Sequence, residues 1–234
     1  MPASFGGNGR VFVNGYNISA FLNSFSLEMS INTSEVSSFL SSAKEYITGQ
    51  TDAISSGEGF WDGSAGAIDE ILAGIKSSES IWSYYPGGNT NGARGYGFRA
   101  LRSAHNTQNT LDEAIRFSLA SQVSKGEESI KSIGGPTTKT ASGSTTVLDL
   151  GTTGSGSDGA TIYFHATAIT GTAIVVVEDS ANNTTWATLA ALTNVSAVGA
   201  QRIEAAGTVD RYIRVTVTLD ASESITFQAG IHVN

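Results

Sequence analysis

The most constraining feature of this sequence is a strict alternation of apolar and polar residues along its C-terminal part. In "SITFQAGIHV", residues 224–233, the apolar positions share one parity and the polar positions the other. Alternation with period two over this length is typical of half-buried β-strands. About eight such segments follow one another between residues 146 and 234, with turn residues between them and no helical pattern. The sequence therefore predicts a C-terminal antiparallel β-sandwich.

The first half of the chain is also predicted to be mainly β. In "RVFVNGYNIS", two β-prone runs flank Asn14 and Gly15, a favoured pair for a type I′ hairpin turn. "FSLEMSI" alternates like a strand. One short helix is predicted at about 65–76, because four apolar residues recur there at helical spacing: Ile68, Ile71, Leu72 and Ile75.

Residues 32–49, "NTSEVSSFLSSAKEYITG", admit two interpretations. Their apolar residues fit a helical stripe, and Asn32 with Glu35 resembles a capping box. Five serines between the apolar residues lower the helix propensity, however. Both a helix and a long extended arm remain open.

A change in composition suggests where the chain divides. "SIGGPTTKTASGSTT", residues 132–146, is rich in Gly, Ser and Thr and has no large apolar residue apart from Ile133. Such a segment is typical of a linker. We predict a first domain over residues 1–135, a linker over 136–145 and a sandwich over 146–234. A flexible linker also predicts that the first domain assembles without the sandwich.

Composition excludes several classes of site. There is no cysteine, so disulfides, zinc-thiolate sites and cysteine nucleophiles are excluded. The net charge is −8, and no cluster of Lys and Arg is large enough to grip DNA. No apolar run is long enough to span a bilayer, so we predict no membrane partner.

No arrangement of residues predicts catalysis. His105, His165 and His232 are scattered, lack a metal-ligand spacing, and are predicted to be exposed or at strand edges. "GSGSDG", Gly154–Gly159, matches G-x-G-x-x-G, but a β-run follows it where a phosphate site needs a helix. Adjacent acids, such as Asp112 and Glu113, point apart on a regular element. We therefore predict no enzyme activity, no cofactor and no metal.

Aromatic residues of the sandwich suggest one alternative function. Trp186, together with Tyr163 and Tyr212, offers a platform on which a sugar ring could stack. A carbohydrate-binding or adhesin module acting through the C-terminal sandwich is therefore kept as the alternative.

Several segments of the first half share the order and texture of a known family. They are "VNGYNIS", "FSLEMSINTSEV", the segment through "GFWDG", "AIDEILAGI", "GARGYGFRALRS" and "LDEAIRFSLASQVSKG". Over about residues 8–130 the chain resembles the major tail-tube proteins of long-tailed bacteriophages. It departs from them at Thr48, where relatives often have proline. The second half resembles the β-sandwich modules that are appended to phage tail proteins.

This resemblance implies a fold and a function. The expected fold is a tail-tube-like β-sandwich or barrel with one helix and a long arm, followed by the C-terminal sandwich. The expected function is structural: copies form rings, usually hexameric, that stack into a tail tube through which DNA is ejected. The arm would be buried between subunits through its apolar residues, which are Phe39, Tyr46, Ile47, Phe60 and Trp61. Glu28 and Asp112 are the predicted acids of the lumen.

The resemblance also implies partners and a location. The first partner is the chain itself, in a homo-oligomeric ring and tube. The others are further tail proteins: the tape measure, the tail terminator, and the baseplate or tip. Double-stranded DNA would pass through without specific binding. Assembly in the host cytoplasm would place the protein in the virion, as part of the phage tail.

Overall fold

The computed structural model of the chain describes residues 6–40, 42–76, 78–151 and 158–234. These residues form a mainly β protein with one α-helix, which confirms the predicted fold class. None of the described helices has the length and hydrophobicity needed to cross a membrane.

The chain divides into two compact units that interleave along the sequence. The hairpin unit comprises Phe21–Glu79 and Phe98–Glu127. The sandwich unit comprises the residues through Ala20, Ser80–Gly97 and Glu128–Asn234.

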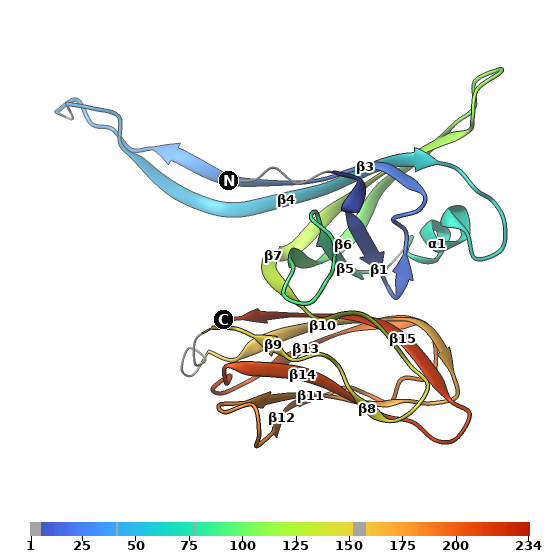
Figure 1. The fold of residues 1–234 in the computed structure, drawn as a ribbon. Helices are drawn as coiled ribbons and strands as arrows, with labels where there is room; N and C mark the ends of the chain where they lie inside the picture. The colour runs from blue at the N-terminus through green and yellow to red at the C-terminus, as the bar shows by residue number, and fades with distance from the viewer. Residues whose placement is uncertain (1–5, 41, 77, 152–157) are drawn as a thin grey trace. The chain divides into compact units, whose positions relative to one another are not determined.

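The hairpin unit is built on a sheet with the strand order β3-β4-β7-β6 (Figure 1). The strands are β3 (Leu22–Glu35), β4 (Tyr46–Phe60), β6 (Arg94–Gln108) and β7 (Arg116–Lys139), of which the last two also extend into the sandwich unit. β3 and β4 form an antiparallel hairpin whose last pair is Glu35 with Tyr46. β4 pairs with β7 only from Ile54 to Phe60, so the hairpin beyond Ile54 projects as a two-stranded ribbon.

The extended interpretation of residues 32–49 is confirmed, and the helical alternative is wrong. Asn32–Glu35 ends β3 and Tyr46–Gly49 begins β4. Cross-strand pairing supplies the backbone hydrogen bonds that a serine-rich helix would have held only weakly.

The two faces of this sheet differ in character. One face carries buried side chains, among them Ala53, Phe117 and Leu119. The helix α1 (Ile68–Gly74) belongs to this side: Arg102 donates to its Leu72 carbonyl oxygen, and its Ile68 and Leu72 are fully buried. The opposite face is mostly polar.

The helix is shorter than predicted. It begins after Gly66, whose φ of +76° is incompatible with a right-handed helix, and it ends at Gly74. Ile75 is buried but already outside the helix, and Lys76 therefore does not occupy the last turn. Asp69 and Glu70 do lie in the first turn, where negative charge suits the helix dipole.

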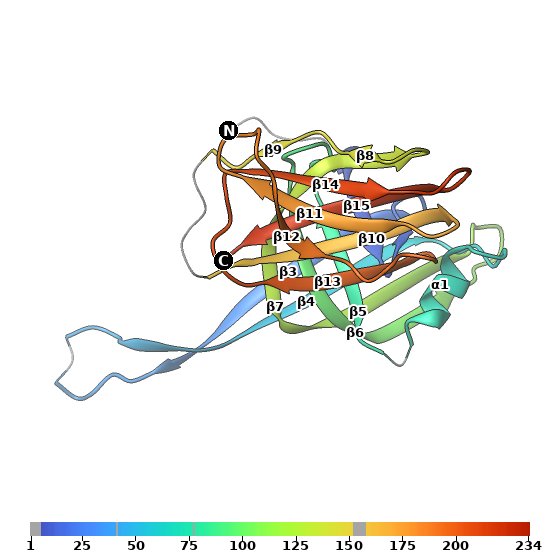
Figure 2. The ribbon, with the colours of Figure 1, turned by 90° about the horizontal axis from the view of Figure 1, so that it is seen from below.

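The predicted C-terminal sandwich is confirmed (Figure 2). One sheet has the order β13-β10-β15-β7 and the other β12-β11-β14-β8, with β9 also pairing with β14. The strands are β8 (Gly143–Ser144), β9 (Leu148–Asp149), β10 (Ala160–Thr170), β11 (Ile174–Ser180), β12 (Ala187–Ala191), β13 (Gly199–Ala205), β14 (Tyr212–Thr218) and β15 (Ser224–Val233). Alternate residues of both sheets form the core, including Phe164, Val177, Val215 and Phe227.

Three strands from the first half of the sequence belong to the sandwich unit. They are β1 (Arg10–Val13), β2 (Tyr16–Asn17) and β5 (Ser80–Tyr85), and the short 3-10 turn η1 (Gly6–Asn8) precedes them. The predicted I′ turn joins β1 to β2, with a positive φ at both Asn14 and Gly15. Phe12 of β1 and Tyr85 of β5 share a buried cluster with Ile130 and Tyr163.

The segment predicted as a linker is partly a strand. Pro136–Lys139 is the end of β7, and Thr137, Thr138 and Lys139 pair with β15. Threonine is well suited to strands, and the Thr138 and Thr226 hydroxyls lie 3.0 Å apart. The composition of this segment thus suits a sheet as well as a linker, and the division into independent domains remains a prediction.

Candidate functional site: a projecting β-hairpin

The feature that stands out in the hairpin unit is the β3–β4 ribbon beyond Ile54 (Figure 1). Two-stranded hairpins are marginally stable alone in water, because they have no second layer to bury their side chains. This ribbon nevertheless exposes many large apolar side chains, namely Met29, Ile31, Val36, Phe39, Leu40, Tyr46 and Ile47. Such a surface is typical of a site that another molecule covers.

Strand register arranges these side chains by face. Met29 and Ile31 continue the row of Phe25 and Leu27 on the apolar side of the sheet. Tyr46 joins that face because it pairs with Glu35, whereas Ile47 pairs with Ser34 and lies on the other face. The apolar side of the ribbon is therefore a direct continuation of the buried face of the sheet, and no helix of the described residues covers it.

The tip of the ribbon is closed by polar contacts and carries the most exposed apolar residues. The Val36 amide donates to the Glu45 carbonyl oxygen at 2.8 Å, and Lys44 pairs with Glu35 at 3.0 Å. Phe39 and Leu40 have exposed fractions of 112% and 97%. The local bonds hold the turn, so the two side chains are free to make contacts outside the molecule.

The structure separates the five arm residues predicted from the sequence. Phe39, Tyr46 and Ile47 lie on the ribbon, whereas Phe60 and Trp61 lie at the opposite end of β4. Phe60 is half exposed and has the Arg116 guanidinium 5.7 Å from its ring centre, and Trp61 is partly buried.

Sequence reasoning missed Met29, Ile31 and Leu40 as surface residues. The alternation of "FSLEMSI" placed Met29 and Ile31 on an apolar face, and that much was correct. The alternation carried no information on whether the face would be covered.

The two predicted lumen acids occupy different places. Glu28 is exposed on the polar face, in a row with Ser24, Ser26 and Ser30. Asp112 is exposed in the turn between β6 and β7, where its φ is +63°. The polar face also carries the carboxylates of Asp52 and Glu58.

The polar face is shallowly hollowed. One depression of about 260 Å³ is bordered by Ser24, Ser26, Ser56, Glu58 and Ser118, above the backbone of Gly57. A second, of about 140 Å³, adjoins it at Glu58 and Ser118 and extends toward Asn106, Gln108 and Arg116. Hydroxyl, amide and carboxylate groups border these depressions, and Phe25 and Leu119 also line the first and Arg116 the second.

The sheet of the hairpin unit has two edges without a strand neighbour in the described chain. Among the described strands, β3 pairs only with β4, which leaves its far edge without a strand partner there from Ser26 to Glu35. β5 has 6 residues against 15 in β6, and it lies beside the start of β6, where Gly95 approaches Tyr84. The edge of β6 from Leu101 to Gln108 is therefore open as well.

The three histidines have different surroundings in the structure. In the described part of the chain, no three His, Cys, Asp or Glu side chains are grouped to hold a metal ion. His232 is partly buried, and its Nδ1 donates to the Ser129 carbonyl oxygen at 2.8 Å. His105 packs against Phe117, and partial burial, followed by the charge of Arg102, lowers the pKa of its imidazole.

The prediction that His165 is exposed or at an edge is wrong. It lies in the centre of β10 and is fully buried, because β1 and β5 cover its face of the sheet. Its Nδ1 accepts the Gly15 amide at 3.3 Å, so its Nε2 carries the proton and donates to the Ser83 hydroxyl at 3.0 Å. Burial lowers the pKa of this imidazole to about 3.

The predicted aromatic platform of the sandwich does not form as a set of three. Tyr163 is buried in a cluster with Phe12 and Tyr85, so its ring is not part of a surface platform. Trp186 is partly buried, and the Arg214 guanidinium stacks on its ring at 4.0 Å. Arg214 is itself held by Glu178 at 2.8 Å, so one ring face of Trp186 is occupied by protein.

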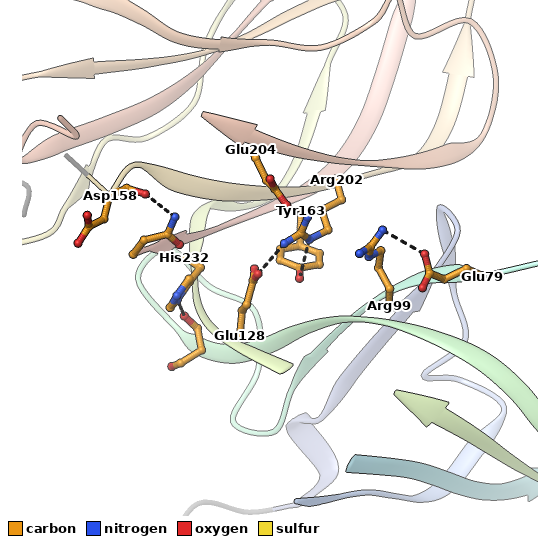
Figure 3. Close-up of polar contacts among 10 residues, drawn as sticks. Glu79, Arg99, Glu128, Asp158, Tyr163, Arg202, Glu204 and His232 are labelled. Atoms are coloured by element: carbon orange, nitrogen blue, oxygen red, sulfur yellow. Dashed lines mark hydrogen bonds and ion pairs between the residues drawn. The ribbon is translucent and has the colours of Figure 1, made fainter. Parts of the chain in front are cut away.

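The densest charge cluster of the sandwich unit surrounds Arg202 (Figure 3). Its guanidinium contacts Glu128 at 2.6 Å, the Tyr163 hydroxyl at 3.2 Å, and Glu204. In the hairpin unit, Arg99 pairs with Glu79 at 3.1 Å. These cations are neutralised by acids within the protein, so they are structural pairs and offer no anion site. Most of the Gly154–Gly159 motif lies outside the described residues.

Comparisons with known proteins give structural matches only. No protein-family model matches the sequence, and no curated protein does. The fold is similar to a component of the virion of a native gene transfer agent particle, with 15% identity and a TM-score of 0.45 over 53% of this chain and 97% of that one. It is also similar to the SPP1 tail tube, with 8% identity and a TM-score of 0.42 over 54% and 78%. A third similar structure is the SPP1 Dit protein, with 9% identity and a TM-score of 0.36 over 94% and 98%.

Proposed function

We propose that this chain is a structural virion protein whose copies join into rings that stack to form a phage tail tube. The observation that carries this proposal is the β3–β4 ribbon, whose apolar face has no cover in the described chain. Burying a side chain such as Ile31 or Phe39 is worth about 1.5–3 kcal/mol, and the ribbon offers several. In an assembly of identical copies, neighbouring copies can bury these apolar side chains of the ribbon.

The open edges support the ring. β3, β4, β7 and β6 alternate in direction, since each neighbouring pair is antiparallel or joined by a short loop. β6 of one copy can therefore pair with β3 of the next in the antiparallel sense, without turning either copy over. Repeating this contact around an axis closes a continuous barrel and removes both open edges. The ring is proposed to be hexameric, as the resemblance in the sequence implies.

The polar face supports a conduit for DNA. In such a barrel the side carrying α1 points outward, and the face with Glu28, Asp52 and Glu58 lines the bore. A wall of hydroxyls and carboxylates has few groups to neutralise phosphates, so DNA passes without being held. Repulsion by these acids acts within a Debye length of about 8 Å at physiological salt. Asp112 would lie at the rim of the barrel.

The remaining proposals follow from this assembly. The partners are other copies of the chain and the further tail proteins: tape measure, terminator, and baseplate or tip. The location is the virion tail after assembly in the host cytoplasm. No enzymatic role is proposed, and the sandwich unit would decorate the outside of the tube.

The proposal is tested by shortening the ribbon. Ile31 and Thr51 face each other in register, so Asn-Gly can replace residues 32–50 as a two-residue turn. We expect this variant to fold with a cooperative melting transition close to that of the full chain and to form no tubes in negative-stain images. The control is Ile174→Lys, which changes a half-exposed apolar residue of the sandwich and is expected to leave tubes intact. Tubes of normal length from the shortened chain would refute the proposal.

A further inference from the structure

The sandwich unit contains all three Asn-Gly dipeptides of the sequence, which are Asn8-Gly9, Asn14-Gly15 and Asn91-Gly92. In such a pair the glycine nitrogen can attack the asparagine side-chain carbonyl carbon, because glycine has no Cβ to hinder the approach. The reaction needs a free side-chain amide and a backbone that can rotate until the two atoms meet. The contacts of each pair therefore determine whether it reacts in the folded chain.

The Asn14-Gly15 pair is held at both reacting groups. The Asn14 Oδ1 accepts the Ile81 amide at 2.9 Å. The Gly15 amide donates to the buried His165 Nδ1 at 3.3 Å. Positive φ values of +45° and +90° keep the two residues in the I′ turn. Attack would require both hydrogen bonds and the turn to open together, so the fold protects this pair.

The Asn91-Gly92 pair is exposed but is also held. The Asn91 Oδ1 accepts the Gly134 amide at 2.8 Å, and its Nδ2 donates to the Val147 carbonyl oxygen at 2.9 Å. The Gly92 amide donates to the Ser132 carbonyl oxygen at 2.9 Å. Exposure to water alone therefore does not make an Asn-Gly pair reactive.

The Asn8-Gly9 pair lacks this protection. Asn8 is exposed, and among the described residues its side-chain amide has no hydrogen-bond partner. It ends η1, a 3-10 turn of 3 residues, and Gly9 lies between this turn and β1. Short 3-10 turns near a chain end have hydrogen bonds of poor geometry and open readily.

We propose that Asn8 is a site of spontaneous deamidation in the folded protein, and that Asn14 and Asn91 are protected from it. Base removes the Gly9 amide proton, and the nitrogen forms a bond to Asn8 Cγ. The bond from Cγ to the side-chain nitrogen breaks, and ammonia leaves with a proton taken from water. Water then opens the resulting succinimide ring at either carbonyl, which gives aspartate or isoaspartate. The inference is independent of the proposed tube.

The position of Asn8 makes this change mild for the fold. Conversion adds one negative charge and, as isoaspartate, one methylene group to the main chain between η1 and β1. The pairing of β1 with β5 begins only at Arg10, opposite Tyr85, so it does not include the altered residue. The same change at Asn14 would break the I′ turn that joins β1 to β2.

Peptide mapping by mass spectrometry measures the rate at each site in the full chain. The protein is incubated in mildly alkaline buffer, folded and in concentrated urea, and each Asn-Gly peptide is followed by the mass gain of an amide converted to an acid. In the folded chain we expect Asn8 to convert at least about tenfold faster than Asn14 and Asn91, since opening even one hydrogen bond lowers the reactive population by about this factor. In urea the three rates should be similar.

Gly9→Ala is the matched variant, because it adds a Cβ at the attacking nitrogen's own residue and leaves Asn8 in place. It should slow conversion of Asn8 by about tenfold and leave Asn14 and Asn91 unchanged. Wild-type protein converted at Asn8 should also keep the melting temperature of the fresh protein. Equal rates at the three sites of the folded chain, conversion of Asn8 only in urea, or no conversion in either condition would overturn the proposal.

Discussion

At the scale of single residues, the structure depends on a few close contacts in the sandwich unit. Gly15, in the β1–β2 turn, donates to His165 and comes so near β13 that an added Cβ would lie 2.4 Å from the Gly199 amide nitrogen. His165 in turn connects β10 to Ser83 of β5. A turn, a buried imidazole and a hydroxyl therefore attach the N-terminal strands to the sandwich.

The Gly15 contact predicts a position-specific cost. Gly15→Ala places a methyl group against the Gly199 and Ala166 backbone, at a φ of +90°, and should lower the free energy of unfolding by more than about 2 kcal/mol. Gly66→Ala is the matched control, because its φ is +76° but nothing lies within 4 Å of an added Cβ. It should cost only about 1 kcal/mol. Equal losses in urea unfolding would show that backbone strain, and not the close approach, sets the cost.

The buried imidazole predicts a dependence of stability on pH. Its pKa is about 3 in the folded chain and about 6.5 when unfolded, so the unfolded chain binds more protons between these values. The contribution of His165 to the free energy of unfolding is fully present above pH 6.5 and falls as the pH is lowered toward 3. At pH 4 the loss from this group is about 3 kcal/mol.

The measurement is urea unfolding of the wild type and of His165→Gln at pH 7 and pH 4. The glutamine cannot titrate, so the variant should lose about 3 kcal/mol less than the wild type over this range. His232→Gln serves as the control and should follow the wild type. Parallel losses in all three proteins would contradict the role of His165.

At the scale of elements, the β3–β4 ribbon behaves as a strand pair whose cover is missing. Met29 and Ile31 repeat the apolar row that Leu119 and Phe117 continue elsewhere on the same face, yet they are exposed. The ribbon persists in the isolated chain through its cross-strand pairing and the bonds of its turn. Its apolar side chains therefore contribute to assembly and little to the stability of the monomer.

This distinction predicts the effect of a charge on the ribbon. Ile31→Lys should leave the monomer's melting temperature nearly unchanged, because Ile31 is 57% exposed. It should raise the concentration needed for polymerisation at least tenfold, since burying a lysine at a subunit contact costs more than 1.4 kcal/mol. Light scattering across a concentration series measures this, with Ile174→Lys as the control. An unchanged threshold for Ile31→Lys would exclude this face from the contact.

At the scale of the whole molecule, the two units are not the two halves of the sequence. β1, β2 and β5 belong with the sandwich strands, and the buried cluster of Phe12, Tyr85, Ile130 and Tyr163 draws on both halves. Gln228 adds a second link, since its side chain bonds to Asn89 and Ser132. Strands from the first half of the sequence are therefore in contact with the sandwich strands.

A truncation tests this arrangement. A chain ending at Gly135 loses Tyr163 and His165 and exposes Phe12, Tyr85 and Ile130, each at a cost of roughly 2 kcal/mol. We expect it to lose its near-ultraviolet circular dichroism and its cooperative melting transition. If the sandwich is separable, as expected from the sequence, the chain ending at Gly135 should instead stay folded and still form tubes. A cooperative transition near that of the full chain would favour that expectation.

The sequence by itself determined the elements of this protein, because strands and turns depend on local chemistry. Alternation located β15, and Asn14-Gly15 specified the I′ turn. Periodicity shows which residues share a face, but only the tertiary structure decides whether that face is covered. His165 and Tyr163 are buried because β1 and β5 reach them from far away in the sequence, whereas Met29 and Ile31 are exposed because nothing in the described chain reaches them.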